Sequence, residues 1–302
     1  MKKYLVGIDG GGSNTKLILT DFDLNILEKS SGGASNFLKI GFEKAVQNVT
    51  DLVEPYFKKY DESSLALVIG TSGAGRESDA NNFEKLLLEC VPSINNIRVV
   101  SDAAITLKGA FENSDGAILI AGTGSILYYK IGNDVKRIGG YGRLIGDEGS
   151  GYSLGRRGIN AISKMLDGRL EEQPLMKLAK TRLKINSTNE LINKIYKDNF
   201  DIASFAEVVI SSAGNGDQFS QSLIDAETDE LIVHLKTMII FNKLSKIDLV
   251  FSGGLVSSEN LYRSVLCEKI ATQVPQISIV EPKFSPEFGA VLIAKEYSIG
   301  KE

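Results

Sequence analysis

The sequence predicts an α/β protein with two domains, and three observations support this prediction. Strand-like apolar runs alternate with helical stretches along the 302-residue chain. A glycine-rich turn between two β-rich runs occurs near the N-terminus and again after residue 121. Between about residues 150 and 246 the strand pattern fades and helical periodicity dominates. We therefore expect two α/β domains, the second with a helical insertion.

Each element is predicted from a short run of residues with the matching periodicity. Strands are expected where β-branched and aliphatic residues cluster, at 4–9, 15–20, 65–70, 97–101, 116–121, 126–131, 247–252 and 277–280. Helices are expected between them, among others at 41–59, 80–90, 102–112, 158–166 and 221–244.

The expected domain boundary is a tight hinge, because the chain has no proline-rich or low-complexity linker. The strand before the second glycine turn places this boundary near 112–116. The last helical segment carries Gly289 and Ala290, which permit close helix packing, so it can cross back to the first domain. The predicted domains are 1–113 plus 286–302, and 114–285 with the insertion at about 150–246.

Composition and charge exclude several classes of function. The chain has 43% hydrophobic and 24% charged residues and a formal net charge of −4, which gives no reason to expect nucleic-acid or membrane binding. No apolar run approaches membrane-spanning length, and the N-terminus lacks a signal-peptide core, so a cytoplasmic location is expected. His234 is the only histidine, and Cys90 and Cys267 have no CxxC spacing. We expect two buried reduced thiols, and neither a zinc site nor a histidine-based triad.

The two glycine-rich turns are candidate phosphate-binding elements. The first comprises Gly10, Gly11, Gly12, Ser13, Asn14 and Thr15, and the second comprises Gly122, Thr123, Gly124 and Ser125. Glycine tolerates positive φ and has no Cβ, so consecutive backbone N–H groups can point at an anion, and the hydroxyl groups add donors. Because a strand follows each turn, neither turn is a dinucleotide fingerprint or a P-loop, which both open a helix. The alternative is that each turn is a plain hairpin loop.

Three aspartates lie beside these turns or at strand ends. Asp9 ends the first strand, where a carboxylate can hold Mg²⁺ next to phosphates or can simply stabilise the turn. Asp102 follows a strand and opens a helix, a position that suits a general base and also a helix N-cap. Asp147 lies in the glycine-rich segment 139–155, which suits a loop around sugar hydroxyls or a surface loop leading into a helix.

Five short segments, in this order, carry a resemblance to a known family. They are 9–16, 101–104, 121–125, 252–255 and 288–292. The chain resembles the N-acetylglucosamine kinase branch of the BadF/BadG/BcrA/BcrD ATPases, in the superfamily of sugar kinases, heat-shock proteins and actin. Each segment is weak alone, but the ordered set covers nearly the whole chain. The segments 146–150 and 35–36 resemble the amino-sugar kinases in particular.

The resemblance implies two ribonuclease-H-like, actin-like ATPase domains hinged about a central cleft. ATP would be held mostly by the second domain, and the sugar by both. It implies a kinase that uses ATP and Mg²⁺ to phosphorylate the 6-hydroxyl of an amino sugar, N-acetylglucosamine or N-acetylmuramic acid, with glucosamine as the alternative. It also implies a homodimer.

Site roles are carried over from the resemblance position by position. Asp102 is the expected catalytic base, and Asp9 is expected to support Mg²⁺. The expected phosphate and nucleotide contacts are Gly10, Gly11, Gly12, Ser13, Asn14, Thr15, Thr123, Gly253 and Gly254. The expected sugar contacts are Asn36, Asp102, Ser125, Gly140, Tyr141 and Asp147. Tyr141 and Arg143 depart from the family pattern of tryptophan and histidine at these positions.

Other interpretations stay open at this point. Arg76 and Arg143 can pair with the lactyl carboxylate of N-acetylmuramic acid, or can be solvated surface residues. An ATP-driven dehydratase activator of the same broad family would hold an iron–sulfur cluster, and a purified protein without iron would exclude it. A non-catalytic sugar sensor on the same scaffold would have no need of a positioned base.

Overall fold

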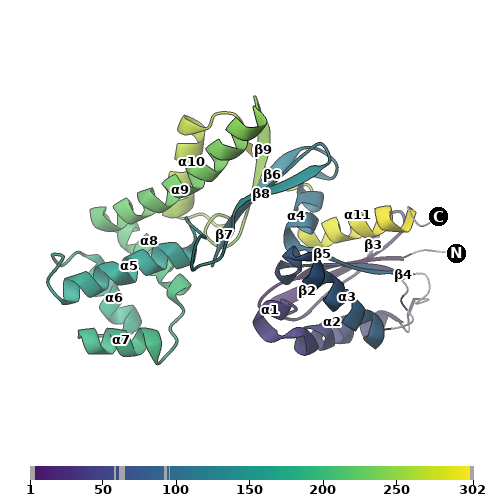
Figure 1. Ribbon diagram of the computed structural model, residues 1–302, viewed down its shortest axis with the longest axis horizontal. Coiled ribbons are helices and arrows are strands. Elements are labelled where there is room, and N and C mark those ends of the chain that lie inside the picture. The colour runs from purple at the N-terminus through teal and green to yellow at the C-terminus, as the bar shows by residue number, and fades with distance from the viewer. Residues whose placement is uncertain (1–3, 58, 61–64, 92–93, 95, 300–302) are drawn as a thin grey trace. The chain divides into compact units, whose positions relative to one another are not determined.

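The computed structural model describes residues 4–57, 59–60, 65–91, 94 and 96–299 (Figure 1). It divides into two compact units, one formed by Met1–Asp115 with Glu281–Glu302 and the other by Gly116–Val280. The boundaries expected from the sequence, 113/114 and 285/286, lie a few residues from these. Each unit is an α/β fold, as predicted.

The first unit is built on a five-stranded mixed sheet with strand order β3-β2-β1-β4-β5. Its strands are β1 (Tyr4–Gly10), β2 (Asn14–Asp21), β3 (Ile26–Gly33), β4 (Leu65–Thr71) and β5 (Ile97–Ser101). The first three pair antiparallel, whereas β4 and β5 run parallel to β1. Its helices are α1 (Phe37–Ile40), α2 (Phe42–Phe57), η2 (Ser72–Gly75), α3 (Glu77–Cys90), α4 (Asp102–Phe111) and α11 (Pro286–Ile299).

Side-chain alternation along the strands gives this sheet two apolar faces, as its fully buried strands require. Val6 and Ile8 of β1 lie in the core that α2 and α3 cover. Leu5 lies in the opposite core, with Ile105 of α4 and Val291 of α11. Helices therefore cover both faces of the sheet (Figure 1).

The C-terminal helix α11 packs on the first unit at glycine contacts. A Cβ on Gly7 of β1 would lie 2.6 Å from the backbone nitrogen of Val291, and a Cβ on Gly289 would lie 2.6 Å from that of Gly109 in α4. Only glycine permits these backbone approaches. Gly7 thus permits the approach of α11 to β1, and Gly289 permits its approach to α4.

The second unit repeats the same topology, with strand order β10-β9-β6-β7-β8. Its strands are β6 (Gly116–Ala121), β7 (Ser125–Ile131), β8 (Asp134–Gly139), β9 (Ile247–Ser252) and β10 (Ile277–Ile279). Between β8 and β9 lie α5 (Gly151–Leu166), α6 (Leu175–Leu183), α7 (Thr188–Tyr196), η3 (Ile202–Phe205), α8 (Ala206–Gly214) and α9 (Gln218–Asn242). These helices are the predicted insertion, and α10 (Leu261–Gln273) follows β9.

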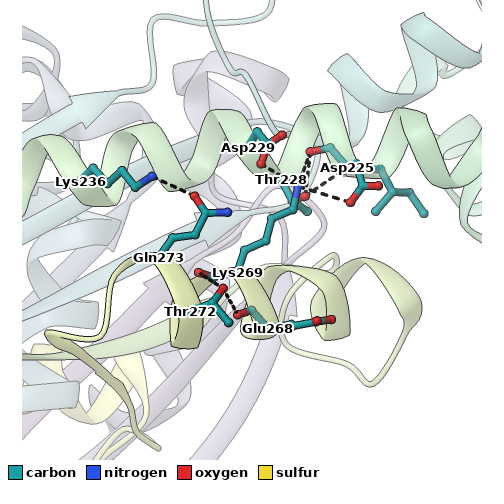
Figure 2. Close-up of polar contacts among 9 residues, drawn as sticks. Asp225, Thr228, Asp229, Lys236, Glu268, Lys269, Thr272 and Gln273 are labelled. Atoms are coloured by element: carbon teal, nitrogen blue, oxygen red, sulfur yellow. Dashed lines mark hydrogen bonds and ion pairs between the residues drawn. The ribbon is translucent and has the colours of Figure 1, made fainter.

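Helices α9 and α10 are joined by polar contacts at the edge of their apolar interface (Figure 2). Lys269 of α10 pairs with Asp229 of α9 at 2.7 Å and with Asp225 at 3.3 Å. Lys236 Nζ donates to Gln273 Oε1 at 2.8 Å. The acidic side chains are exposed, so these pairs contribute little to stability, on the order of 0–1 kcal/mol each.

Every predicted strand is confirmed, but β3 and β8 were missed. Both are the edge strands that follow an antiparallel partner, and both carry mainly exposed, polar or charged residues instead of an apolar run. The prediction of two buried thiols was wrong: Cys90 is exposed at the end of α3, and Cys267 is only partly buried. In the part of the chain that the structure describes, no helix is long and apolar enough to cross a membrane.

Candidate active site

The first glycine turn joins β1 to β2 and is tight because backbone atoms approach each other closely. Gly11 N donates to Asn14 O at 3.0 Å. A Cβ on Gly10 would lie 2.6 Å from Ser35 Oγ, and a Cβ on Gly11 would lie 2.6 Å from Asn14 O. Positive φ, one of the two reasons expected for these glycines, occurs at none of Gly10–Gly12. Close approach therefore requires glycine at Gly10 and Gly11, whereas a Cβ on Gly12 would make only an ordinary contact with Lys39, at 3.5 Å.

The polar residues of this turn are placed differently from one another. Thr15 is fully buried, and its hydroxyl donates to Gly33 O at 2.7 Å and lies 2.7 Å from Ser35 Oγ. Ser13 and Asn14 are exposed, and Gly12 is half-buried. Thr15 therefore supports the turn from inside, whereas Gly12, Ser13 and Asn14 form its accessible surface.

Two other carboxylates of the first unit lie close enough to Asp9 to raise its pKa. Burial raises the pKa of Asp9 to about 6, and the negative charges of Glu287 and Asp102 add to this effect, while Lys16 opposes it. The Oε2 atom of Glu287, in the first turn of α11, is buried and has no hydrogen-bond partner among the described residues. The carboxylates around Asp9, at the end of β1, therefore carry negative charge that few neighbouring groups compensate.

Asp102 is the first residue of α4 and does not cap it. The cap is Ser101, whose Oγ accepts from Ala104 N at 3.2 Å. The Asp102 carboxylate accepts from Ala103 N at 2.8 Å, and burial raises its pKa above the ordinary value. A carboxylate with a raised pKa is a stronger base, so its chemistry suits proton transfer.

Asn36 lies near the first turn and caps the short helix α1. Its Oδ1 accepts from Leu38 N at 3.1 Å, and its Nδ2 donates to Ser72 Oγ at 2.6 Å. The preceding residue, Ser35, is the one that Thr15 and Gly10 contact. Asn36 is thus fixed beside the turn by both of its amide atoms.

In the second unit, the turn between β6 and β7 supports the N-terminus of α5. Gly151 N donates to Gly122 O at 2.7 Å, and Tyr152 N donates to Thr123 O at 3.1 Å. Ser125 is buried, and its hydroxyl donates to Glu148 O at 2.5 Å. Like Thr15, Ser125 is therefore occupied by an internal contact, which ties the turn to the segment 140–150.

The segment 140–150 is a loop whose backbone depends on unusual conformations. Positive φ occurs at Gly140, Gly142, Gly149 and also at Asp147, where φ is +59°. Asp147 Oδ1 accepts from Gly142 N at 3.0 Å, so the loop closes on its own carboxylate. Burial raises the pKa of Asp147, and the charge of Glu148 adds to this. Tyr141, by contrast, is 64% exposed.

A buried carboxylate that we had not predicted, Glu227 of α9, holds this loop. Its Oε2 accepts from Gly149 N at 2.7 Å, and its Oε1 accepts from Ser153 Oγ at 2.8 Å and pairs with Arg157. Tyr262 of α10 donates its hydroxyl to Gly149 O at 2.6 Å. The sequence did carry a signal, since Glu227 lies at a helical spacing that otherwise places apolar residues such as Ile224 in the core.

The glycine pair after β9 docks beside the second turn. Gly253 has φ +97°, and a Cβ there would lie 2.5 Å from Ala121 O. Leu255 N donates to Ala121 O at 3.0 Å. A Cβ on Gly122 would lie 3.6 Å from Gly254 N. The turn at 122–125 and the glycine pair at 253–254 are therefore neighbours, although more than a hundred residues of sequence separate them.

We expect Gly253→Ala to destabilise the protein by about 1–3 kcal/mol, because alanine is strained at this φ and its methyl group meets the β6 backbone. Gly254→Ala is the matched control, since a Cβ there has open space. Thermal unfolding of both variants would check this. Equal melting temperatures would contradict the assignment of Gly253 as the constrained position.

The carboxylates of the first unit are a donor set that fits Mg²⁺ delivered with phosphates. No group of three His, Cys, Asp or Glu side chains able to hold a metal ion occurs among the residues the structure describes. Mg²⁺ does not need one, because it keeps several waters and uses one or two carboxylates together with substrate phosphates. Asp9 and the partnerless oxygen of Glu287 supply such carboxylates.

Comparison with known proteins adds three findings. The sequence model of the BadF/BadG/BcrA/BcrD ATPase family matches residues 6–294. The N-acetylmuramic acid/N-acetylglucosamine kinase of Clostridium acetobutylicum is 34% identical over 303 residues, covering 97% of this chain and 98% of that protein. The N-acetyl-D-glucosamine kinase of Dictyostelium discoideum is 25% identical over 312 residues, covering 97% and 98%.

A solved structure shares the fold. It is that of a proposed N-acetylglucosamine kinase from Chromobacterium violaceum, with a TM-score of 0.79 at 24% identity, covering 97% of this chain and 99% of the other. At this identity the likeness speaks for the fold alone. It agrees with the repeated five-stranded sheet seen in the two units.

Proposed function

Because the chain belongs to the BadF/BadG/BcrA/BcrD ATPase family, we propose that it transfers the γ-phosphoryl group of ATP to the 6-hydroxyl of an N-acetylated amino sugar. The acceptors that we propose are N-acetylglucosamine and N-acetylmuramic acid. The sequence likeness to kinases of these sugars extends over almost the whole chain, which supports the proposal. The single observation that carries the chemistry is the partly buried Asp102 carboxylate at the start of α4, directly after β5 and with a raised pKa.

In this proposal Asp102 accepts the proton of the sugar 6-hydroxyl as that oxygen attacks the γ-phosphorus. Its carboxylate accepts from Ala103 N, the amide of the second residue of α4, and lone pairs remain for a substrate hydroxyl. General-base catalysis of this kind contributes roughly 10²–10⁴-fold to the rate. Most of the remaining rate enhancement in phosphoryl transfer comes from positioning and charge stabilisation.

The phosphates would be bound by the accessible parts of the glycine turns. In the first unit the proposed phosphate contacts are Gly10, Gly11, Gly12, Ser13 and Asn14, and in the second unit they are Thr123, Gly253 and Gly254. Backbone N–H groups at such turns favour an anion without a basic surface, which suits the negative net charge of this chain. Thr15, whose hydroxyl is occupied internally, acts by holding the first turn.

Asp9 and Glu287 are the residues that would hold Mg²⁺. When bound with ATP, the ion supplies positive charge beside the phosphates. It would also compensate the repulsion that raises the pKa of Asp9. Without the ion, that repulsion has only Lys16 against it among the groups that act on Asp9.

The acceptor sugar would be bound by Asn36, Asp102, Ser125, Gly140, Tyr141 and Asp147. Asp147 can accept from sugar hydroxyls through its second oxygen, since Oδ1 already accepts from Gly142 N. Ser125 offers only its lone pairs, because its proton is donated to Glu148 O.

We also propose that the protein forms a homodimer and acts in the cytoplasm. Light scattering would test the homodimer, and cell fractionation would test the location.

A coupled assay of ADP formation across four sugars tests the proposal. We expect ATP consumption with N-acetylglucosamine and N-acetylmuramic acid, and little with glucose, because the N-acetyl group is absent. Glucosamine is the informative control, since preference for it would move the protein to the glucosamine kinases. No sugar-dependent ADP formation with any of the four would overturn the proposal.

A further inference from the structure

A polar cavity of about 400 Å³ lies wholly within the second unit. It is lined by the Thr123–Gly124 turn, by Arg143 and Asp147 of the 140–150 loop, by Tyr152 of α5 and by the segment 199–202. Two of these groups already have a role in the proposed function: Thr123 toward phosphate and Asp147 toward sugar. Arg143 has none, although it faces the same space.

Arg143 is a cation for which the described part of the chain supplies no ion-pair partner. Its guanidinium lies over the ring of Tyr152, with Cζ 5.5 Å from the ring centroid. Among the residues the structure describes, no carboxylate lies within ion-pair distance of it, even though Asp147 and Asp201 line the same cavity. The stacking holds the planar group in place and leaves its donors for another partner.

The two carboxylates that line the cavity accept hydrogen bonds from backbone amides. Asp147 Oδ1 accepts from Gly142 N at 3.0 Å, and Asp201 Oδ1 accepts from Ala203 N at 3.1 Å as the cap of η3. Each therefore stabilises its own backbone segment and does not neutralise Arg143. A guanidinium with free donors at a polar cavity matches an oxyanion, most closely a carboxylate that it can bind in two-pronged fashion.

We propose that Arg143 binds the carboxylate of an acidic substituent on the acceptor sugar, and so makes this cavity the subsite for a 3-O-carboxyalkyl group. The inference rests on the proposed function, because it presupposes that the sugar ring binds at Asp147. A sugar hydroxyl on Asp147 and a carboxylate on Arg143 would fix the sugar at two points. The other source of an oxyanion here is the nucleotide, whose phosphates would reach Arg143 past Thr123.

The test compares N-acetylmuramic acid, which has the carboxylate, with N-acetylglucosamine, which lacks it, in wild type and in Arg143→Met. Methionine keeps the unbranched apolar stem of the side chain and removes the charged guanidinium. We expect the ratio of kcat/KM for N-acetylmuramic acid over that for N-acetylglucosamine to fall about 10- to 100-fold, as loss of a charge-assisted hydrogen bond predicts, with KM for ATP within about threefold. Arg182→Met, an exposed arginine of α6 outside the cavity, is the matched control.

Three results would overturn the inference. Equal losses on both sugars with a raised KM for ATP would mean that Arg143 binds the nucleotide. An unchanged ratio would mean that it binds no anion, and a wild type that phosphorylates N-acetylglucosamine alone would mean that the cavity does not take the acidic group. If no sugar is phosphorylated, the proposed kinase function fails, and calorimetric binding of N-acetylmuramic acid to wild type and Arg143→Met still decides the role of Arg143.

Discussion

Asp102→Asn should lower kcat by about 10²–10⁴-fold while leaving the fold and the affinity for ATP almost unchanged. The amide oxygen of asparagine can still accept from Ala103 N, so the start of α4 keeps its hydrogen bond. What asparagine cannot do is accept the proton of the sugar hydroxyl. Because burial disfavours the charged form of Asp102, the loss of its charge carries no large penalty for folding.

Steady-state turnover, the melting temperature and nucleotide binding by calorimetry would together check this prediction. Asp23→Asn, which removes an exposed carboxylate from the turn between β2 and β3, is the control and should keep normal turnover. Turnover of Asp102→Asn within about threefold of wild type would remove Asp102 from the catalytic role. A large fall in the melting temperature would instead show that Asp102 is mainly structural.

Glu227→Ala should lower the free energy of unfolding by about 2–4 kcal/mol, because it leaves the buried Gly149 N–H without an acceptor and removes a buried side chain. The substitution leaves Gly149 N, Ser153 Oγ and Arg157 without their shared acceptor in a buried position. It also frees the loop that contains Asp147 from α9, so KM for the sugar should rise more than KM for ATP. Glu227→Gln keeps one acceptor oxygen and should be affected less.

The matched control for Glu227 lies on the same helix. Asp229→Ala removes an exposed partner of Lys269, which keeps Asp225 (Figure 2), and should cost on the order of 0–1 kcal/mol. Chemical denaturation of the three variants measures the difference. A Glu227→Ala protein as stable as Asp229→Ala would show that the buried carboxylate does not hold the loop.

Much of the fold was predictable because buried strands carry an apolar signal of their own. The runs that became β1, β4, β6 and β9 are nearly continuous in aliphatic residues. Strands β3 and β8 are specified by pairing with a neighbour and not by their own composition, so the pattern failed there. Tertiary pairing is information that a local window does not contain.

The candidate site also contains residues that the sequence could predict and residues whose contacts it could not. Asp9, Asp102 and the glycine turns stand at strand ends, where sequence order alone makes them candidates. The hydroxyl groups of Thr15 and Ser125 form hydrogen bonds inside the protein with residues eighteen or more positions away, namely Gly33, Ser35 and Glu148. Glu227 acts on Gly149 across 78 positions of sequence, so its role could not be inferred from neighbouring residues.

Nuclear magnetic resonance of the reaction product tests the central claim most directly. Wild-type protein incubated with ATP, Mg²⁺ and N-acetylglucosamine should yield a phosphomonoester whose phosphorus couples to the two protons on carbon 6 of the sugar. The Asp102→Asn protein should yield almost none of it in the same time. A phosphate on another sugar oxygen, or release of inorganic phosphate without any sugar phosphate, would contradict the account.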